Sequence, residues 1–477
     1  MNIRETIVKD RIARINELSH QMGCEVPVAR EVPLVPFLAA PEIICEVKRR
    51  SPSRGDIHAN MDPVAQARRY YDAGIRSVSC LTEEEYFSGS LKDLMAIKAE
   101  LPELAVLRKD FLVDLEDVEV SYRAGADAIL LIASVLEPAL LADMQRRAHQ
   151  LGMQALVEVH TPAEIDAVRP AAPQLVGINA RDLSDFSVDL LLPIRLRERI
   201  DWPARTVFES GIWHGEQADM ATSNGFDGIL VGESVVRHPE RIPELIEGVS
   251  HPGRDFWARL QHLNQDGRPL VKICGLAREE DALLGEKLGA DVLGFVFADS
   301  PRRADADLVR SLPRGRALRV AVVQARRTGA GFALDPEVAA LLSEGLIDAL
   351  QYHGDEMPQE CARPGYPYYK ALRVRGADDI EAAGTYRCPR ILADSFVKGL
   401  PGGTGTRLET GLVRELSART PGLWLAGGLN ADNVATIIAE HRPELIDVSS
   451  GLESAPAQKD HKLMERYFKE IDHASRV

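Results

Sequence analysis

The chain has 477 residues, 45% of them hydrophobic and 27% charged, which is typical of a folded globular protein. Its formal net charge of −15 disfavours nucleic acid and anionic membranes as partners, because no basic excess is available to neutralise phosphates. This length predicts two domains, or at most three.

The N-terminal segment and the cysteines predict a cytoplasmic protein. Residues 1–20 are charged throughout and lack the apolar centre of a signal peptide. No apolar run approaches the ~18 residues that a membrane span needs. The cysteines are widely spaced, with no CxxC pair and no zinc pattern, which suits a reducing compartment. They are Cys24, Cys45, Cys80, Cys274, Cys361 and Cys388.

The first half alternates short apolar runs with amphipathic helical patterns. Residues 3–22 predict an N-terminal helix. The β-branched runs that follow predict parallel strands at 42–48, 77–82, 105–111, 128–134, 154–160, 175–181, 206–212 and 228–234. Eight such units in about 200 residues favour a closed barrel. An open, doubly wound sheet alternates strands and helices in the same way and remains the alternative.

The pattern restarts after a polar stretch at 251–269, in which a short helix is possible. Its strands are predicted at 270–275, 292–299, 319–324, 349–354, 368–374, 390–395, 423–428 and 445–451. The two halves share this architecture without obvious residue-level identity. We therefore expect an α/β protein with two tandem (β/α)8 barrels, at 1–255 and 268–477, joined by a linker at 256–267.

Polar side chains stand at the C-terminal ends of the strands predicted in the first half. Side chains two residues apart share a strand face, so Glu46 and Lys48 point the same way. The same placement recurs at Lys109, Glu158, Asn179, Arg181 and Glu209. A single such charge is as readily a solvated side chain, but repetition on several strands favours an active site, because these strand ends converge in a barrel.

Glycine-containing turns follow the last two predicted strands, at 209–211 and 231–234. Backbone N–H groups bind phosphate at this place in many barrels. The segments EVKRRSPSRG (46–55), LTEEEYFSGS (81–90), LRKDF (107–111), LVEVH (156–160), GINARDL (177–183), ESGI (209–212) and VGES (231–234) resemble those of the indole-3-glycerol phosphate synthase family. The resemblance covers about residues 1–250.

This resemblance implies that carboxyphenylamino-deoxyribulose phosphate loses CO2 and water to give indole-3-glycerol phosphate. It implies that Lys109 is the general acid, that Glu158 is its acid/base partner in dehydration, and that Glu46 lies beside them. The substrate-binding residues that it implies are Lys48, Ser51, Phe111, Asn179, Arg181, Glu209, Ser210, Gly211, Gly232 and Glu233. Among these, Ser51 and the glycine turns would hold phosphate, and Phe111 would line the pocket for the anthranilate ring.

In the second half, Lys272 and Cys274 share a strand face, and a glycine follows at the mouth of the predicted barrel. A cysteine is most often a small buried hydrophobe, but at this mouth a thiolate could face a ligand. Asp394 ends the sixth strand. The turns GGTG (402–405), AGG (426–428) and SSG (449–451) suit close approach of backbone amides to a phosphate.

The second half resembles the phosphoribosylanthranilate isomerase family in KICG (272–275), GFVFADSPR (294–302), QYHG (351–354), AGGLNADN (426–433), DVSSGLE (447–453) and KDH (459–461). The resemblance implies an Amadori rearrangement with Cys274 as base and Asp394 as acid. It implies that Arg302 binds the anthranilate carboxylate. The phosphate-binding residues that it implies are Gly403, Thr404, Gly405, Gly427, Gly428, Ser449 and Ser450.

Three places depart from the isomerase pattern and bear on substrate fit: the third strand at 319–324, Tyr352, and RLET at 407–410. We expect a bifunctional enzyme in which the isomerase product feeds the synthase. Two barrels acting on other phosphosugars are a weaker alternative, given these motifs, and an active synthase fused to an inactive phosphate-binding barrel is another. No metal or other cofactor is expected. The expected partners are phosphorylated anthranilate-sugar substrates, and the expected state is a monomer.

Overall fold

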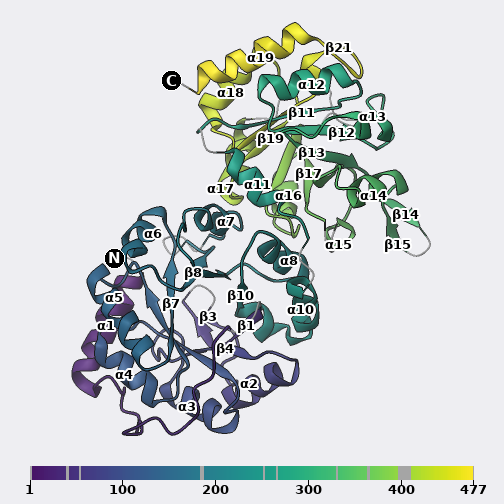
Figure 1. The fold of residues 1–477 in the computed structure, drawn as a ribbon. Coiled ribbons are helices and arrows are strands. Elements are labelled where there is room, and N and C mark those ends of the chain that lie inside the picture. Colours follow the sequence, from purple (N-terminus) through teal and green to yellow (C-terminus); the bar gives the residue numbers. More distant parts are fainter. Residues whose placement is uncertain are drawn as a thin grey trace. The chain divides into compact units, whose positions relative to one another are not determined.

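The structure is a computed structural model that describes residues 3–38, 42–52, 55–182, 187–250, 253–264, 267–328, 331–361, 366–395 and 410–475. The chain divides into two compact units, Met1–Pro252 and Gly253–Val477. Figure 1 shows the order of their helices and strands. No helix in the described ranges combines the length and the apolar character that crossing a membrane requires.

The first unit contains a closed barrel of parallel strands in the order β1-β4-β5-β6-β7-β8-β9-β10, with β10 pairing back to β1. The strands are β1 (Glu42–Val47), β4 (Ser77–Leu81), β5 (Ala105–Lys109), β6 (Ala128–Ile132), β7 (Gln154–Val159), β8 (Leu175–Asn179), β9 (Arg205–Glu209) and β10 (Gly228–Val231). A short hairpin, β2 (Arg50–Ser51) and β3 (Gly55–Asp56), follows β1. Every strand predicted in this half is present, and barrel closure excludes the open sheet.

One helix of the first unit precedes the first barrel strand, and the others come after barrel strands. The helices are α1 (Ile3–Leu18), α2 (Pro63–Asp72), α3 (Leu91–Glu100), α4 (Leu115–Arg123), α5 (Pro138–Gln150), α6 (Pro162–Val168), α7 (Leu192–Arg197), α8 (Gly215–Ser223), α9 (Glu233–Arg237) and α10 (Ile242–Ser250). Several begin at a side-chain cap. Asp62, for example, accepts from the backbone N–H groups of Val64 and Ala65.

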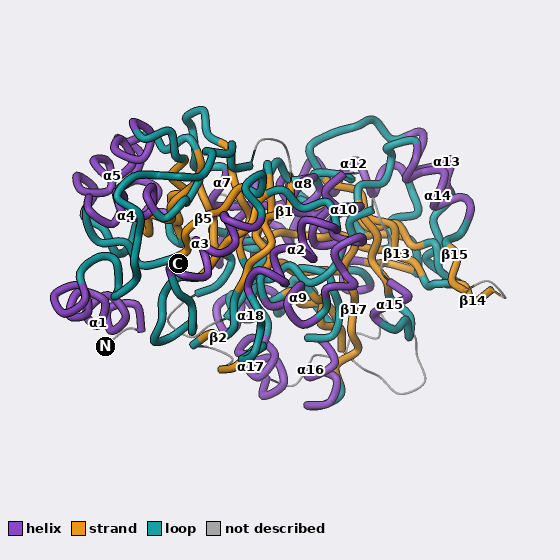
Figure 2. The backbone as a smooth tube through the Cα atoms, turned by 90° about the horizontal axis from the view of Figure 1, so that it is seen from below, coloured by secondary structure: helices purple, strands orange, loops and turns teal. Residues whose placement is uncertain are grey.

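The second unit closes a second parallel barrel in the order β11-β12-β13-β16-β17-β18-β19-β20. Its strands are β11 (Leu270–Cys274), β12 (Val292–Val296), β13 (Leu318–Val323), β16 (Ala349–Tyr352), β17 (Tyr368–Val374), β18 (Ile391–Ser395), β19 (Trp424–Ala426) and β20 (Leu445–Val448). The prediction of two tandem (β/α)8 barrels is therefore confirmed. Two hairpins are added: β14 (Arg326–Thr328) with β15 (Gly331–Ala333), which projects outward in Figure 2, and β21 (Glu453–Ala455) with β22 (Gln458–Lys459).

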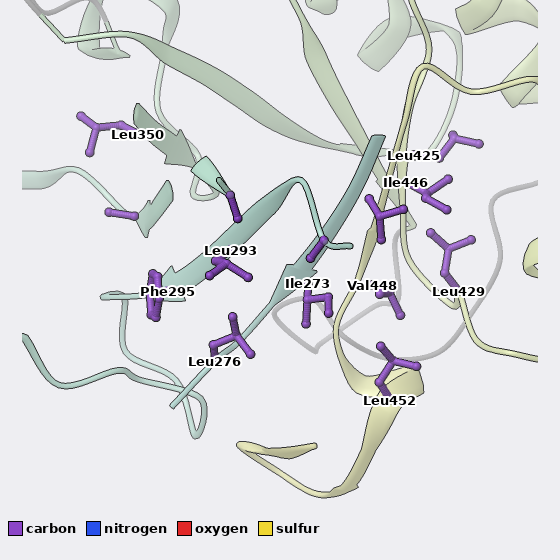
Figure 3. Packing of buried hydrophobic residues seen from close by; sticks show 14 of the residues in the cluster. Ile273, Leu276, Leu293, Phe295, Leu350, Leu425, Leu429, Ile446, Val448 and Leu452 are labelled. Carbon is purple, nitrogen blue, oxygen red and sulfur yellow. The ribbon is translucent and has the colours of Figure 1, made fainter. Parts of the chain in front are cut away.

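The helices of the second unit are α11 (Phe256–Leu263), α12 (Glu279–Leu288), α13 (Ala306–Ser311), α14 (Pro336–Ser343), α15 (Pro358–Cys361), α16 (Ala377–Ala383), α17 (Thr410–Arg419), α18 (Val434–His441) and α19 (His461–Ala474). Side chains that point away from the barrel axis form the layer beneath them. Figure 3 shows Ile273, Leu293, Ile446 and Val448 from three neighbouring strands in this layer. Because strand side chains alternate, Lys272 and Cys274 face the interior instead.

Helix α11 lies in the segment that the sequence predicts as a linker. Its Phe256 and Trp257 are 1% and 2% exposed, and the Trp257 ring lies 6.1 Å from the ring of Trp424, at the start of β19. Arg259 pairs with Asp348 at 2.8 Å. The segment 256–267 therefore contains a helix that packs within the second unit.

This packing predicts that α11 is needed for stability of the second unit. A fragment of residues 253–477 should unfold at higher urea concentration than a fragment of residues 268–477. Because each fully buried large apolar side chain contributes about 1.5–3 kcal/mol, we expect a difference on the order of 5 kcal/mol in the free energy of unfolding. Equal unfolding free energies, measured by circular dichroism in urea, would show that α11 is only a connector.

Candidate active sites

The first barrel has a cavity at the C-terminal ends of its strands. The cavity has about 1210 Å³ of space, open solvent at its mouth included. The structure brings every site residue predicted in the first half to its wall. These residues are Glu46, Lys48, Ser51, Lys109, Phe111, Glu158, Asn179, Arg181, Glu209, Ser210, Gly211, Gly232 and Glu233.

Lys109 lies among carboxylates in this cavity. Its Nζ is 3.0 Å from Glu158 Oε2 and 2.6 Å from Glu209 Oε2. Burial alone would lower the pKa of Lys109, but the nearby carboxylates outweigh burial and raise it. Lys109 is therefore held as an ammonium that donates to side chains of β7 and β9.

The two carboxyl groups that accept from Lys109 differ in proton affinity. Burial and the charge of Glu158 raise the pKa of Glu209 to about 8, against the opposing effect of Lys109. For Glu158 the effect of burial is outweighed by Lys109 and His160, and its pKa falls to about 2. Glu209 therefore holds a proton more tightly than Glu158, and both carboxyl groups face one ammonium.

Two glycines lie next to these charged groups, and the charged groups occupy the space that a larger side chain at either position would need. Gly177 pairs in register with Glu158, and a Cβ at Gly177 would lie only 1.9 Å from Glu209 Oε1. A Cβ at Gly232 would lie 2.6 Å from Glu46 Oε1 and 3.0 Å from Lys48 Nζ. Glu46 and Lys48 form an ion pair at that point. A larger residue at either glycine would displace the charged side chains.

The N-terminal helix contributes to the first cavity, which the sequence patterns did not indicate. Ile3, Arg4 and Ile7 of α1 line the cavity. Arg11 anchors this helix. It is 5% exposed and contacts Asp110 at 3.0 Å and Asp117 at 2.6 Å.

Asp110 connects α1 to the strand that carries Lys109. Its carboxylate also accepts from Thr82 at 2.6 Å and from Arg108 at 2.9 Å. Burial would raise the pKa of Asp110, but Arg11 and Arg108 outweigh burial and lower it. The only local signal in the sequence was a pair of charges, Arg108 and Asp110, on either side of Lys109.

Among the described residues, one group has metal-ligand geometry: His20, Asp114 and Asp117. These side chains are already engaged by the protein. Asp117 accepts from Arg11 and from the backbone N–H of Val113 at 2.8 Å. Asp114 caps α4 and contacts His20 at 2.6 Å. This arrangement accounts for the group as an anchor between α1 and α4.

The second barrel has a cavity of about 950 Å³ at the same end of its strands, open solvent at its mouth included. Its wall contains the predicted site residues that the structure describes, namely Cys274, Arg302, Asp394, Gly427, Gly428, Ser449 and Ser450. Gly403, Thr404 and Gly405 lie outside the described residues, as does 407–409 of the divergent RLET segment.

Cys274 is buried beside a lysine. Burial raises the pKa of the Cys274 thiol, and Lys272 partly offsets that increase. A Cβ at Gly294 would lie 3.0 Å from Cys274 Sγ and 3.1 Å from Lys272 Cε, so both side chains pack against this glycine. Lys272 Nζ is 2.5 Å from Asp447 Oδ2. In this structure the thiol form of Cys274 is favoured.

Asp394 has a histidine partner that the sequence analysis did not assign. His353 Nε2 lies 3.1 Å from Asp394 Oδ2, and Gln351 Nε2 lies 3.3 Å from His353 Nδ1. Both partners come from the QYHG segment. Asp447 was missed in the same way, although it begins the DVSSGLE segment. Each of these motifs contained a polar side chain at a strand end, which is the signal that identified the other site residues.

Two arginines line the second cavity, and their surroundings differ. Arg302, which sequence analysis assigned to a carboxylate, already contacts Glu453 through Nε at 2.8 Å and Nη2 at 2.8 Å. Lys459 contacts the same Glu453 at 3.0 Å. Arg373 Nε is buried and has no hydrogen-bond partner among the described residues. A substrate carboxylate at Arg302 would therefore compete with Glu453.

The glycine turns of the second barrel have the backbone conformation expected of an anion cradle. Gly427 and Gly428 have φ of 85° and 65°, and the carbonyl of Gly428 accepts from Asn433 Nδ2 at 2.7 Å. A Cβ at Gly275 would lie 3.0 Å from Ser449 Oγ. Gly427, Gly428, Ser449 and Ser450 line the same cavity.

Closed parallel barrels with acid–base side chains and glycine turns at their strand C-terminal ends define the chain as a two-site (β/α)8-barrel enzyme. The chain belongs to the indole-3-glycerol phosphate synthase family, whose model matches residues 5–245. In tandem with it, the model of N-(5'phosphoribosyl)anthranilate (PRA) isomerase matches residues 271–470.

Individual relatives match one half or both. The multifunctional tryptophan biosynthesis protein of Phanerodontia chrysosporium is 28% identical over 87% of this chain, which spans 60% of that relative's length. The indole-3-glycerol phosphate synthase of Exiguobacterium sibiricum is 39% identical to this chain. The match covers 44% of this chain and 81% of the length of that synthase. A solved phosphoribosyl anthranilate isomerase from Thermotoga maritima is 32% identical over 43% of this chain and 99% of its own, with a TM-score of 0.38.

The anchor of α1 can be tested by stability. Arg11→Ala should lower the free energy of unfolding of the first unit by about 3–5 kcal/mol, because it leaves two buried carboxylates without their shared partner. Arg68→Ala is the matched control: the Arg68–Glu100 pair is exposed, so about 1 kcal/mol or less should be lost. Similar losses for the two variants in urea unfolding would contradict the anchoring role of Arg11.

Proposed function

We propose that the first barrel converts carboxyphenylamino-deoxyribulose phosphate to indole-3-glycerol phosphate, and that the second barrel supplies this substrate from phosphoribosylanthranilate. The synthase proposal rests above all on the position of Lys109 between Glu158 and Glu209. Ring closure develops negative charge on the substrate carbonyl oxygen, and dehydration requires a base to remove a proton. One ammonium and one ionised carboxylate in a single cavity can meet both requirements.

In the proposed synthase reaction Lys109 donates to the carbonyl oxygen as the new C–C bond forms. Because its ammonium is held charged by carboxylates, it stabilises the developing oxyanion throughout the step. CO2 then leaves from the ring carbon at which the bond formed, and its bonding electrons restore the aromatic ring. In the dehydration that follows, the hydroxyl made from the carbonyl leaves as water and Glu158 accepts a proton from the neighbouring methylene carbon. Lys48, Asn179 and Arg181 orient the substrate, with Glu46 and Glu209 beside the reacting groups.

The proposed binding residues also have a division of labour. The backbone N–H groups at Ser210, Gly211, Gly232 and Glu233, with Ser51, bind phosphate at the ends of β9 and β10. The carboxylate of Glu233 pairs with Arg237 at 3.0 Å, which offsets its negative charge. Phe111 packs against Phe87, with ring centroids 6.4 Å apart, and both line the cavity for an aromatic ring.

For the isomerase, the observation that carries the proposal is the presence of Cys274 and Asp394 in one cavity with glycine turns. Asp394 donates a proton to open the ribose ring, and Cys274 removes the proton from C2. Gly427, Gly428, Ser449 and Ser450 bind the phosphate, and the motif with Gly403, Thr404 and Gly405, which lies outside the described residues, is assigned to phosphate binding by the sequence resemblance alone. Arg302 binds the anthranilate carboxylate after exchanging its contact with Glu453. We further propose that the chain acts as a cytoplasmic monomer.

Changes in the first barrel should affect only the synthase reaction. Lys109→Ala and Glu158→Gln should each lower indole-3-glycerol phosphate formation by about 100-fold or more, the usual scale for losing a positioned acid or base. Isomerisation by the same preparations should stay near the wild-type rate. Lys92→Ala, an exposed lysine on α3, is the matched control and should affect neither reaction. Loss of both activities in a folded variant would contradict the assignment of one site to each barrel.

Cys274→Ser tests the isomerase base, because a serine hydroxyl is too weak an acid to supply the anion that a thiol supplies. Isomerisation should fall by about 100-fold or more, and Asp394→Asn should have a similar effect. In the wild type the rate should rise as pH increases above neutral, because the pKa of Cys274 is raised and only the thiolate is the base.

Cys361→Ser provides the control for the cysteine change, since Cys361 is buried in the same unit but does not line the cavity. The Cys361→Ser variant should keep the wild-type isomerase rate, and that rate should still increase with pH. Initial rates measured from pH 6 to 9 would settle the comparison. A Cys274→Ser variant with a near-normal rate would remove Cys274 from the mechanism.

A further inference from the structure

His160 follows β7 directly and stands behind a proposed catalytic residue. It is 7% exposed, and in the sequence it comes two residues after Glu158. Among the described residues, Glu158 is part of the wall of the first cavity and His160 is not. A role for His160 in the reaction must therefore act through Glu158.

Both ring nitrogens of His160 face carboxylates. Nε2 lies 3.3 Å from Glu158 Oε1, and Nδ1 lies 3.3 Å from Glu164 Oε2. A neutral imidazole has one N–H and one lone pair, so it would direct the lone pair at a carboxylate oxygen. An imidazolium presents an N–H to each side. Nε2 is buried without an aligned hydrogen bond among the described residues, so its contact with Glu158 is one of charge.

Glu164 is itself fixed by the start of α6. Its backbone N–H donates to the capping side chain of Thr161 at 3.2 Å. Its carboxylate accepts from the backbone N–H of His160 at 2.6 Å as well as facing the ring. The helix start therefore holds Glu164, Glu164 holds the imidazole, and the imidazole faces Glu158.

The surrounding charges favour the protonated ring. Burial lowers the pKa of His160, but Glu164 and Glu158 outweigh burial and raise it. Arg4 of α1 opposes this increase. On the other side of Glu158 lie Lys109 and, beyond the ammonium, Glu209. The pKa of Glu164 is lowered in turn, chiefly by its contacts with His160 against the effect of burial.

We propose that His160 is a positioning residue for the synthase reaction: its imidazolium, held by Glu164, fixes the Glu158 carboxylate and keeps it ionised as the proton acceptor. This inference rests on the function proposed for the first barrel. The active form contains charged His160, so the synthase should lose activity as pH rises through the raised pKa of that ring. Glu164 sets the pH at which this loss of activity begins, although it does not line the substrate cavity.

Glu164→Gln tests the relation most sharply. The amide can still accept from the backbone N–H of His160, but it removes one of the two carboxylates that stabilise the imidazolium. The alkaline loss of synthase activity should therefore begin about one pH unit lower than in the wild type. If Glu164 had only a structural role, Glu164→Gln would change the stability of the chain and leave the pH profile of synthase activity unchanged.

His160→Gln removes the ring charge while keeping an N–H donor near the position of Nε2. We expect kcat to fall on the order of tenfold, equivalent to about one pKa unit of lost interaction, with KM nearly unchanged. The alkaline step of the wild-type profile should disappear. His238→Gln is the control, because the half-exposed His238 ring contacts Glu240 on the surface and does not line the cavity; this variant should retain the wild-type kcat and pH profile.

The charge of the ring can be measured without turnover. In the 15N-histidine-labelled full chain, the ring signals that vanish in His160→Gln should show an imidazolium at pH 7 that persists above the ordinary pKa of histidine, about 6.5. In Glu164→Gln the same signals should titrate at lower pH. A neutral His160 at pH 7, or an alkaline profile unaltered by Glu164→Gln, would overturn the proposal.

These outcomes separate the inference from the proposed function. A wild-type chain that makes no indole-3-glycerol phosphate would refute the function proposed for the first barrel, while the NMR titration would still decide the charge of His160. If His160→Gln does not fold, Glu164→Gln and the wild-type titration carry the test.

Discussion

A buried ammonium requires a carboxylate held at contact distance, and both candidate active sites of this chain depend on that constraint. Removing an ion from water costs several kcal/mol, and only a well-placed partner offsets the cost. Lys109 meets the requirement with Glu158 and Glu209, and Lys272 meets it with Asp447. In each barrel these partners come from different strands, so closure and strand register determine whether the charges balance.

The same constraint explains why small residues surround the charged groups. Gly177 leaves the volume that the Glu209 carboxylate occupies, and Gly294 leaves the volume for Lys272 and Cys274. The charge balance then sets the proton affinities. Glu158 and Glu209 are the same residue type in one cavity, yet their pKa values are about 2 and about 8. An acid and a base can thus come from two glutamates because their neighbours differ.

Much of this architecture was predictable from the sequence because strand periodicity is a local property. The runs that predict strands all became barrel strands, and the alternation of side chains correctly placed Lys109 and Cys274 toward the interior. Contacts between distant segments were not predictable in this way. Arg11 meets Asp110 across 99 positions of sequence, and no local pattern joins them. The short helix considered possible within residues 251–269 is present as α11, but no local pattern indicated that its Phe256 and Trp257 would be buried in the second unit.

The central claim is that one chain carries both reactions, and a coupled assay tests it most directly. The purified full chain should be given phosphoribosylanthranilate as the only substrate, and indole-3-glycerol phosphate should be followed with time. The account predicts that this product forms without any added enzyme, after transient accumulation of carboxyphenylamino-deoxyribulose phosphate. If the chain instead makes indole-3-glycerol phosphate only when carboxyphenylamino-deoxyribulose phosphate is supplied, the second barrel is not an isomerase and the claim is wrong.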